Sequence, residues 1–181
     1  MLLNTPICDF GWQAPDFTLP DTNNKMHKLD KLIGKNGLLI AFICNHCPYV
    51  KAIIERLVTD AAALQQHSVN TVAIMPNDHQ RYPEDSPENM VAFITRHHIP
   101  FPYLIDETQQ VAKAYAAVCT PDFFGFNAEG ELHYRGRLDN ARVGKADNRQ
   151  PELLEAMIEV AETGQGPEHQ VPSMGCSIKW R

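Results

Sequence analysis

The strongest hydrophobic pattern in the chain is an uninterrupted apolar run at positions 38–43. A run of this kind predicts a central strand that is buried on both faces of a largely parallel sheet. Apolar residues recur at spacings of three and four from Val50 onward, in a pattern that runs to about Gln66 and predicts a helix with one apolar stripe against that sheet. The residues at 44–47, Cys-Asn-His-Cys, are therefore expected where the strand ends and the helix begins.

Shorter patterns predict the remaining elements. A polar turn at 21–24 between two apolar segments predicts an N-terminal hairpin. The other expected elements are a strand over 71–75, a helix that begins at Pro87 with Ser86 as its N-cap, a strand over 101–105, a helix over about 108–118, a hairpin of 123–126 with 132–134, and a helix over about 151–162. This order predicts an α/β fold in a single domain over 1–181, with a core at about 10–163 and a C-terminal tail at 164–181.

Composition and charge restrict the possible functions. The chain has 181 residues, of which 44% are hydrophobic and 21% are charged, as is typical of a globular domain. The formal net charge of -6 and the lack of a basic run argue against nucleic-acid or membrane binding. The N-terminus lacks the pattern of a signal peptide and no apolar run could span a bilayer, so we expect a cytoplasmic protein. Five cysteines in a reducing compartment are expected to be catalytic or buried thiols.

Cys44 and Cys47 are the candidate reactive residues. The N-terminus of a helix has unpaired N–H groups and about half a positive charge, which stabilise a thiolate and lower the pKa of a thiol. With Cys44 expected at that N-terminus and Cys47 one turn further on, the pair is suited to open and close a disulfide. Pro48 suits the first turn because it has no N–H to leave unpaired. The alternative is that both cysteines are small, buried apolar residues.

The C-x-x-C between a strand and a helix resembles the active site of thioredoxin-fold oxidoreductases, and three further motifs resemble the alkyl hydroperoxide reductase/thiol-specific antioxidant (AhpC/TSA) redoxins. These motifs are Ala-Pro-Asp-Phe-Thr-Leu at 14–19, Cys-Thr-Pro-Asp-Phe-Phe at 119–124 and Gly-Cys-Ser-Ile-Lys-Trp at 175–180. The resemblance implies a thioredoxin-like fold, in which helices flank a central mixed sheet and an N-terminal hairpin and a C-terminal tail are added. It also implies that Thr120-Pro121 is a cis-proline loop facing the cysteines, with an ordinary trans proline as the alternative.

Residues around the motif have expected roles, each with an alternative. Asn45 and His46 lie between the two cysteines, where a protonated His46 would favour the thiolate and make the disulfide more oxidising. An exposed histidine without effect is the alternative. Cys176, in a tail rich in Gly and Pro, is a candidate resolving thiol for the C-x-x-C pair, or an idle thiol. Cys119 is expected to be a packed thiol, with a position near the active site as the alternative, and Cys8 has a weaker claim than Cys176 to a resolving role.

Three functions are compatible with these residues. The first is a thiol-disulfide oxidoreductase that acts on protein or small-molecule disulfides and thiols without a cofactor, with Cys44 attacking and Cys47 resolving. The second is a thiol-dependent peroxidase, an antioxidant enzyme whose sulfenic acid condenses with a neighbouring cysteine. The third is a carrier of copper or zinc that uses the same thiols. It is the least favoured of the three, and the favoured function has no metal site.

Two departures from the known patterns concern the helpers of the cysteines. Typical peroxiredoxins have a threonine at the position of Cys44 and an arginine at the position of Thr120. Typical thioredoxins have a buried aspartate at the position of Leu38, where it moves protons. His79 and Glu84, in the loop after the second buried strand, are candidates for that role.

Overall fold

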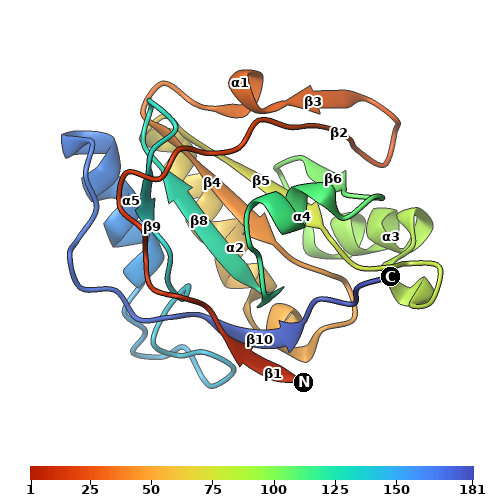
Figure 1. Ribbon diagram of the computed structural model, residues 1–181. Helices are drawn as coiled ribbons and strands as arrows, with labels where there is room; N and C mark the ends of the chain where they lie inside the picture. Colours follow the sequence, from red (N-terminus) through yellow and green to blue (C-terminus); the bar gives the residue numbers. More distant parts are fainter.

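The protein, described over residues 1–181 by a computed structural model, is built around a five-stranded mixed sheet (Figure 1). In spatial order its strands are β6 (Tyr103–Ile105), β5 (Val69–Met75), β4 (Gly37–Phe42), β8 (Asp122–Phe126) and β9 (Leu132–Tyr134). Strands β4, β5 and β6 are parallel, whereas β8 is antiparallel to β4 and β9 is antiparallel to β8. The expected α/β fold with a central mixed sheet is confirmed.

Helices and a hairpin cover the two faces of this sheet (Figure 1). One face carries α2 (Pro48–Gln66), α3 (Pro87–His97) and α5 (Glu152–Thr163), and the other carries α1 (Leu29–Leu32), α4 (Gln110–Ala114) and the hairpin of β2 (Thr18–Pro20) with β3 (Met26–Lys28). Alternate residues of β4 enter opposite cores: Ala41 packs in the cluster of Leu57 from α2, and Ile40 packs in the cluster of Tyr115. Every residue of β4 is buried, as its apolar run predicts.

Most helix boundaries follow from local sequence. The Ser86 hydroxyl accepts a hydrogen bond from the Asn89 N–H at 3.3 Å and caps α3 as expected. Gly164 ends α5 with a φ of 77°, in the left-handed region that glycine adopts without steric cost. The helix expected over 108–118 is wrong in length, because Ala116 turns the chain with a φ of 50° and α4 ends at Ala114.

Two strands near the chain ends form a second sheet with a short strand beside the C-x-x-C. This sheet has the order β1 (Leu2–Asn4), β10 (Met174–Ser177) and β7 (Cys119–Thr120), and both pairings are antiparallel. The segment expected as a C-terminal tail, 164–181, contributes strand β10 to this sheet. Gly175 permits the pairing, because a Cβ there would lie 2.1 Å from the Thr120 carbonyl oxygen. Both termini thus lie at the same edge of the molecule (Figure 1).

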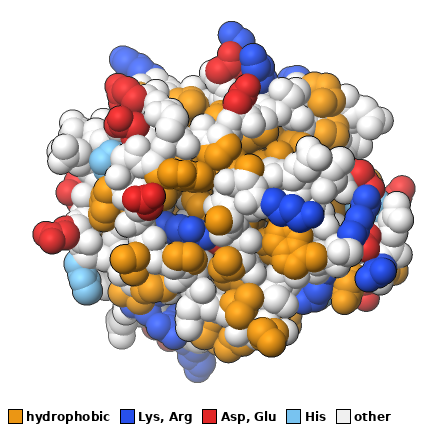
Figure 2. Space-filling view, viewed as in Figure 1, with side chains coloured by type: hydrophobic (Ala, Val, Ile, Leu, Met, Phe, Trp, Pro, Cys, Tyr) orange, Lys and Arg blue, Asp and Glu red, His pale blue; other side chains and the backbone are white.

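The surface is mixed in character. No helix combines the length and the apolar composition needed to cross a bilayer. Apolar side chains are spread over the face shown in Figure 2, and several of them lie in its lower half, where β1 and β10 run. The exposed members near these strands include Met1, Leu2 and Trp180. This end of the molecule is also the end that carries the C-x-x-C.

Candidate active site

Cys44 and Cys47 lie in the turn that joins β4 to α2. The helix begins at Pro48, and Cys47 is its N-cap with an extended backbone at φ -65° and ψ 123°. The expectation that the helix begins near Cys44, with Cys47 one turn inside it, is therefore wrong. The physical reason is Pro48, whose ring disfavours helical geometry in the residue before it, so the helix cannot extend back to Cys44. Pro48 itself occupies the first helical position as expected.

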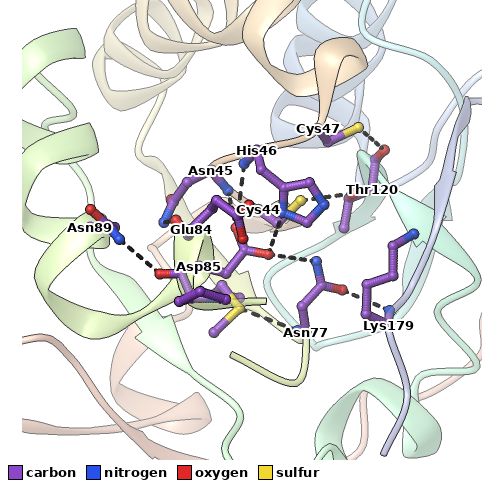
Figure 3. A network of polar contacts seen from close by, with 12 residues as sticks. Cys44, Asn45, His46, Cys47, Asn77, Glu84, Asp85, Asn89, Thr120 and Lys179 are labelled. Carbon is purple, nitrogen blue, oxygen red and sulfur yellow. Dashed lines mark hydrogen bonds and ion pairs between the residues drawn. The ribbon is translucent and has the colours of Figure 1, made fainter. Parts of the chain in front are cut away.

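Thr120 lies against both sulfur atoms (Figure 3). The Cys44 Sγ is 3.3 Å from the Thr120 hydroxyl oxygen, and a protonated Cys47 donates to the Thr120 carbonyl oxygen at 3.2 Å. The peptide bond between Thr120 and Pro121 is cis, as the resemblance implies. Cys44 is 1% exposed and Cys47 is 0% exposed, so the pair is enclosed by the protein.

The two thiols differ in acidity. A hydrogen bond from the Cys44 thiol, above all, lowers the pKa of Cys47 to about 4, and the Val50 N–H at the helix start adds to this effect. The same hydrogen bond raises the pKa of Cys44, and burial and the negative charge of Asp85 raise it further. Cys47 is the more acidic thiol of the reduced pair, because it caps α2 and the helix N-terminus acts on its sulfur.

A buried carboxylate anchors the two residues between the cysteines. Asp85, in the 3-10 turn η1 (Pro83–Asp85), is fully buried. Its Oδ1 accepts from the backbone N–H groups of Asn45 at 2.8 Å and His46 at 3.3 Å. Its Oδ2 accepts from His46 Nδ1 at 2.7 Å and from Asn77 Nδ2 at 2.8 Å (Figure 3). Four donors therefore fix the turn that holds the cysteines.

The ion pair in this network places a positive charge beside the thiols. The hydrogen bond to Asp85, above all, raises the pKa of His46 above its ordinary value of 6.5. Burial alone would raise the pKa of Asp85, but the hydrogen bonds from His46 and Asn77 lower it below 3.8. At neutral pH this favours an aspartate paired with an imidazolium, and the cation lies between the two cysteines in the sequence.

Asn45 has a structural role in the same turn. The Tyr103 hydroxyl donates to Asn45 Oδ1 at 3.1 Å and to the Ile43 carbonyl oxygen at 3.3 Å. Asn45 Nδ2 donates in turn to the Glu84 carbonyl oxygen at 3.1 Å. Asn45 therefore ties the turn to the first residue of β6 and to η1.

The residues suggested as proton carriers do not reach the thiols. His79 Nε2 lies 2.5 Å from a carboxylate oxygen of Glu107, and Glu84 contributes only its backbone carbonyl to the network. Asp85, the neighbour of Glu84, was not singled out from the sequence. The order of the strands could have indicated Asp85. Strands β4 and β5 are adjacent and parallel, so their carboxyl ends meet at one edge of the sheet and the loops that follow them lie close together.

The other cysteines divide into one near the pair and two apart from it. Cys176 packs against the core cluster that contains Cys44 and Cys47, whereas Cys8 packs against the cluster on the opposite face of the sheet. Cys119 is buried, with its thiol 3.5 Å from the Pro121 carbonyl oxygen, and burial raises its pKa. Of these three cysteines, Cys176 is the one that packs against the core cluster of the C-x-x-C.

A metal carrier finds little support in this arrangement. One donor atom each from Cys44, His46 and Asp85 lie within 4.8 Å of one another. Each carboxylate oxygen of Asp85, however, already accepts two hydrogen bonds, and one imidazole nitrogen of His46 is among their donors. The donor set is thus used to build the turn, and it does not fit an open metal site.

Comparison with known proteins agrees with the geometry. A profile described as the AhpC/TSA family matches residues 10–135. A crystal structure of an uncharacterized conserved protein from Geobacillus kaustophilus is 42% identical, covers 100% of this chain and 97% of its own, and has a TM-score of 0.93. The thioredoxin domain of a thiol-disulfide oxidoreductase from Bacteroides vulgatus is 17% identical, with a TM-score of 0.59 over 70% of this chain and 86% of its own. The expected thioredoxin-like fold is confirmed.

A curated relative shows a similar but shorter match. Thiol-disulfide oxidoreductase ResA of Bacillus subtilis is 28% identical over 125 residues, which are 67% of this chain. The match spans 64% of that relative, so somewhat less than two thirds of its length is represented here. The family profile matches residues 10–135, and this part of the chain contains the C-x-x-C.

Proposed function

Because this chain belongs to the AhpC/TSA family, we propose that it is a thiol-disulfide oxidoreductase in which Cys44 and Cys47 exchange two electrons with a protein or small-molecule disulfide. One observation carries the proposal. Cys47 is the N-cap of α2 and the neighbouring Cys44 thiol lowers its pKa, so the pair combines an acidic thiol with a second thiol that can close a disulfide on it. The relative named as a thiol-disulfide oxidoreductase supports the same chemistry.

In this reaction Cys47 is the attacking sulfur and Cys44 the resolving one, the reverse of the order expected from the sequence. The Cys47 thiolate attacks a disulfide, forms a mixed disulfide and releases the first substrate thiolate. Cys44 then loses its proton and attacks the Cys47 sulfur, which closes Cys44–Cys47 and releases the second thiolate. The low pKa of Cys47 also makes it a good leaving group when the pair is reduced again.

The residues around Cys47 favour disulfide exchange over peroxide reduction. The Cys44 thiol occupies the position at which typical peroxiredoxins have a threonine hydroxyl. Thr120 stands where the arginine would be, and it touches both sulfurs itself. A peroxide would therefore lack the two groups that hold it, whereas a second thiol for disulfide exchange is in place.

The test combines a redox titration with an activity assay. The reduced protein is equilibrated in glutathione buffers of graded ratio, the disulfides are mapped by mass spectrometry, and the reduction of insulin by dithiothreitol is followed. We expect Cys44–Cys47 to form and insulin reduction to be accelerated. Cys44→Ser and Cys47→Ser should remove both effects, and Cys8→Ser should remove neither. A fast reaction with hydrogen peroxide that only Cys47→Ser abolishes, without acceleration of insulin reduction, would show a peroxidase instead.

A further inference from the structure

The burial of the C-x-x-C raises the question of how its sulfurs meet thiols outside the protein. Cys44 and Cys47 are 1% and 0% exposed, whereas Cys176 is partly exposed. Thiol–disulfide exchange requires direct contact between two sulfur atoms. In this conformation an external thiol can therefore reach Cys176 but neither member of the pair.

Strand β10 holds Cys176 against the pair. Cys176 lies opposite Thr120 in the antiparallel pairing of β10 with β7, and the Thr120 carbonyl oxygen is 3.2 Å from Cys47 Sγ. Cys176 packs against the core cluster that contains Cys47, and the two thiols are close enough for each to shift the pKa of the other. On its other side β10 pairs with β1, which places Leu2 opposite Cys176. Cys176 thus lies near the buried Cys47 and also reaches the surface.

We propose that Cys176 relays electrons between the buried Cys44–Cys47 pair and thiols outside the protein, an inference that rests on the proposed function of that pair. In the oxidised protein the Cys176 thiolate attacks Cys47 Sγ. The Cys44–Cys47 bond breaks, a Cys47–Cys176 disulfide forms, and Cys44 leaves as a thiolate that takes up a proton.

An external dithiol then completes the reduction. One of its thiolates attacks the Cys176 sulfur, which releases the Cys47 thiolate and leaves a mixed disulfide on Cys176. The second thiol of the dithiol attacks the sulfur of its own molecule in that mixed disulfide and releases the Cys176 thiolate. The dithiol leaves as a disulfide, having given two electrons to the pair. With an external disulfide the same steps run in reverse, and the disulfide that Cys47 attacks is then the one between Cys176 and the substrate.

The charges around Cys176 favour this order of steps. Burial raises the pKa of Cys176, and the hydrogen bond and negative charge of Cys47 raise it further, whereas Lys179 and the chain's amino terminus lower it. Oxidation of Cys47 removes its negative charge. Cys176 therefore becomes more acidic, and forms its thiolate more readily, when Cys47 is in a disulfide that it can attack.

The first test traps the intermediate. Cys44→Ser is oxidised with glutathione disulfide and its disulfides are mapped by mass spectrometry. We expect a Cys47–Cys176 disulfide that persists in Cys44→Ser/Cys8→Ser and is lost in Cys44→Ser/Cys176→Ser. If Cys47 pairs with no protein cysteine in Cys44→Ser, the relay is wrong.

The second test measures the rate at which the oxidised pair is reduced. Without Cys176 the dithiol has to attack a buried sulfur, so loss of Cys176 should slow reduction about tenfold or more with dithiothreitol at about 0.1 mM. Cys176→Ser and Cys176→Ala should both show this loss, and Cys8→Ser should behave as wild type. An unchanged rate in both Cys176 variants overturns the relay. Failure of wild type to form Cys44–Cys47 at all would instead overturn the proposed function.

Discussion

The ion pair between His46 and Asp85 leads to a prediction that can be worked out from the structure. In Asp85→Asn, an NH2 group placed at the Oδ2 position would face two donors, His46 Nδ1 and Asn77 Nδ2, which lie 2.7 and 2.8 Å from that oxygen. Both donors would lose their acceptor, and the imidazolium would lose its counter-ion. Charged hydrogen bonds contribute about 1.5–3 kcal/mol and an unsatisfied buried donor costs about 1–3 kcal/mol. His46 keeps a 25% exposed side chain that water can solvate, so we expect a loss near 3 kcal/mol in the free energy of unfolding.

The loss should depend on pH in a defined direction. The pKa of His46 is raised on folding, so its contribution is fully present below 6.5 and is lost as the pH rises through the raised value. The pKa of Asp85 is lowered on folding, so its contribution is present above 3.8 and is lost as the pH falls through the lowered value. The destabilisation by Asp85→Asn should therefore be largest between these two ordinary values, and smaller in alkaline solution.

A double-mutant cycle measured by urea unfolding of the reduced protein checks this expectation. It compares wild type, Asp85→Asn, His46→Gln and the double variant at about pH 5.5 and about pH 8.5, with the exposed Asp147→Asn as the control that should change nothing. The coupling energy of His46 with Asp85 should be about 2 kcal/mol at the lower pH and should fall at the higher pH. A coupling that is equal at both pH values, or below about 0.5 kcal/mol at pH 5.5 as for an exposed pair, would refute the assignment of a charged His46.

Three further changes have expected outcomes. Arg135→Met should lower the free energy of unfolding by about 3–5 kcal/mol in urea titrations, because it leaves the fully buried Asp122 without the guanidinium now 3.0 Å away; a change near zero would contradict this. Gly125→Ala should cost about 1–3 kcal/mol in the same titration, since its Cβ would lie 2.3 Å from a methionine sulfur in the core; unchanged stability would show that this core can shift. Thr120→Val should raise the pKa of Cys44, because the Thr120 hydroxyl lowers it, and thiolate absorbance against pH in Cys47→Ser and its Thr120→Val double variant tests the direction.

The sequence was most informative at the C-x-x-C, where the apolar pattern of a buried strand is followed by that of a helix. The apolar run of β4 and the apolar stripe of α2 placed the C-x-x-C at their junction, because both patterns arise from burial, which acts on many residues at once. The start of α2 was predicted three residues too early, although Pro48 carries the local signal that prevents it. Patterns of burial thus located the site, and one backbone rule was needed to decide which cysteine caps the helix.

Features that depend on distant pairing were not predicted. Strand β10 is four residues long with Gly175 inside it, so it shows no alternation, and it forms only because β7 and β1 offer their edges. Asp85 looked like one of several polar residues in a loop, and its importance comes from the turn folded around it. Cys176 was a candidate resolving thiol from the sequence, but the pairing of β10 with β7 that places it near Cys47 was not predicted.

The order of the strands along the chain has a consequence for the newborn protein. β10, which covers Cys47, is the last of the ten strands to leave the ribosome, whereas β4 and α2 emerge early. A nascent chain therefore carries the reactive pair without this cover until β10 has emerged and pairs with β7. Oxidation during synthesis should then join Cys44 to Cys47 before Cys176 exists, and arrested chains that lack β10 should react faster with alkylating reagents than the finished protein.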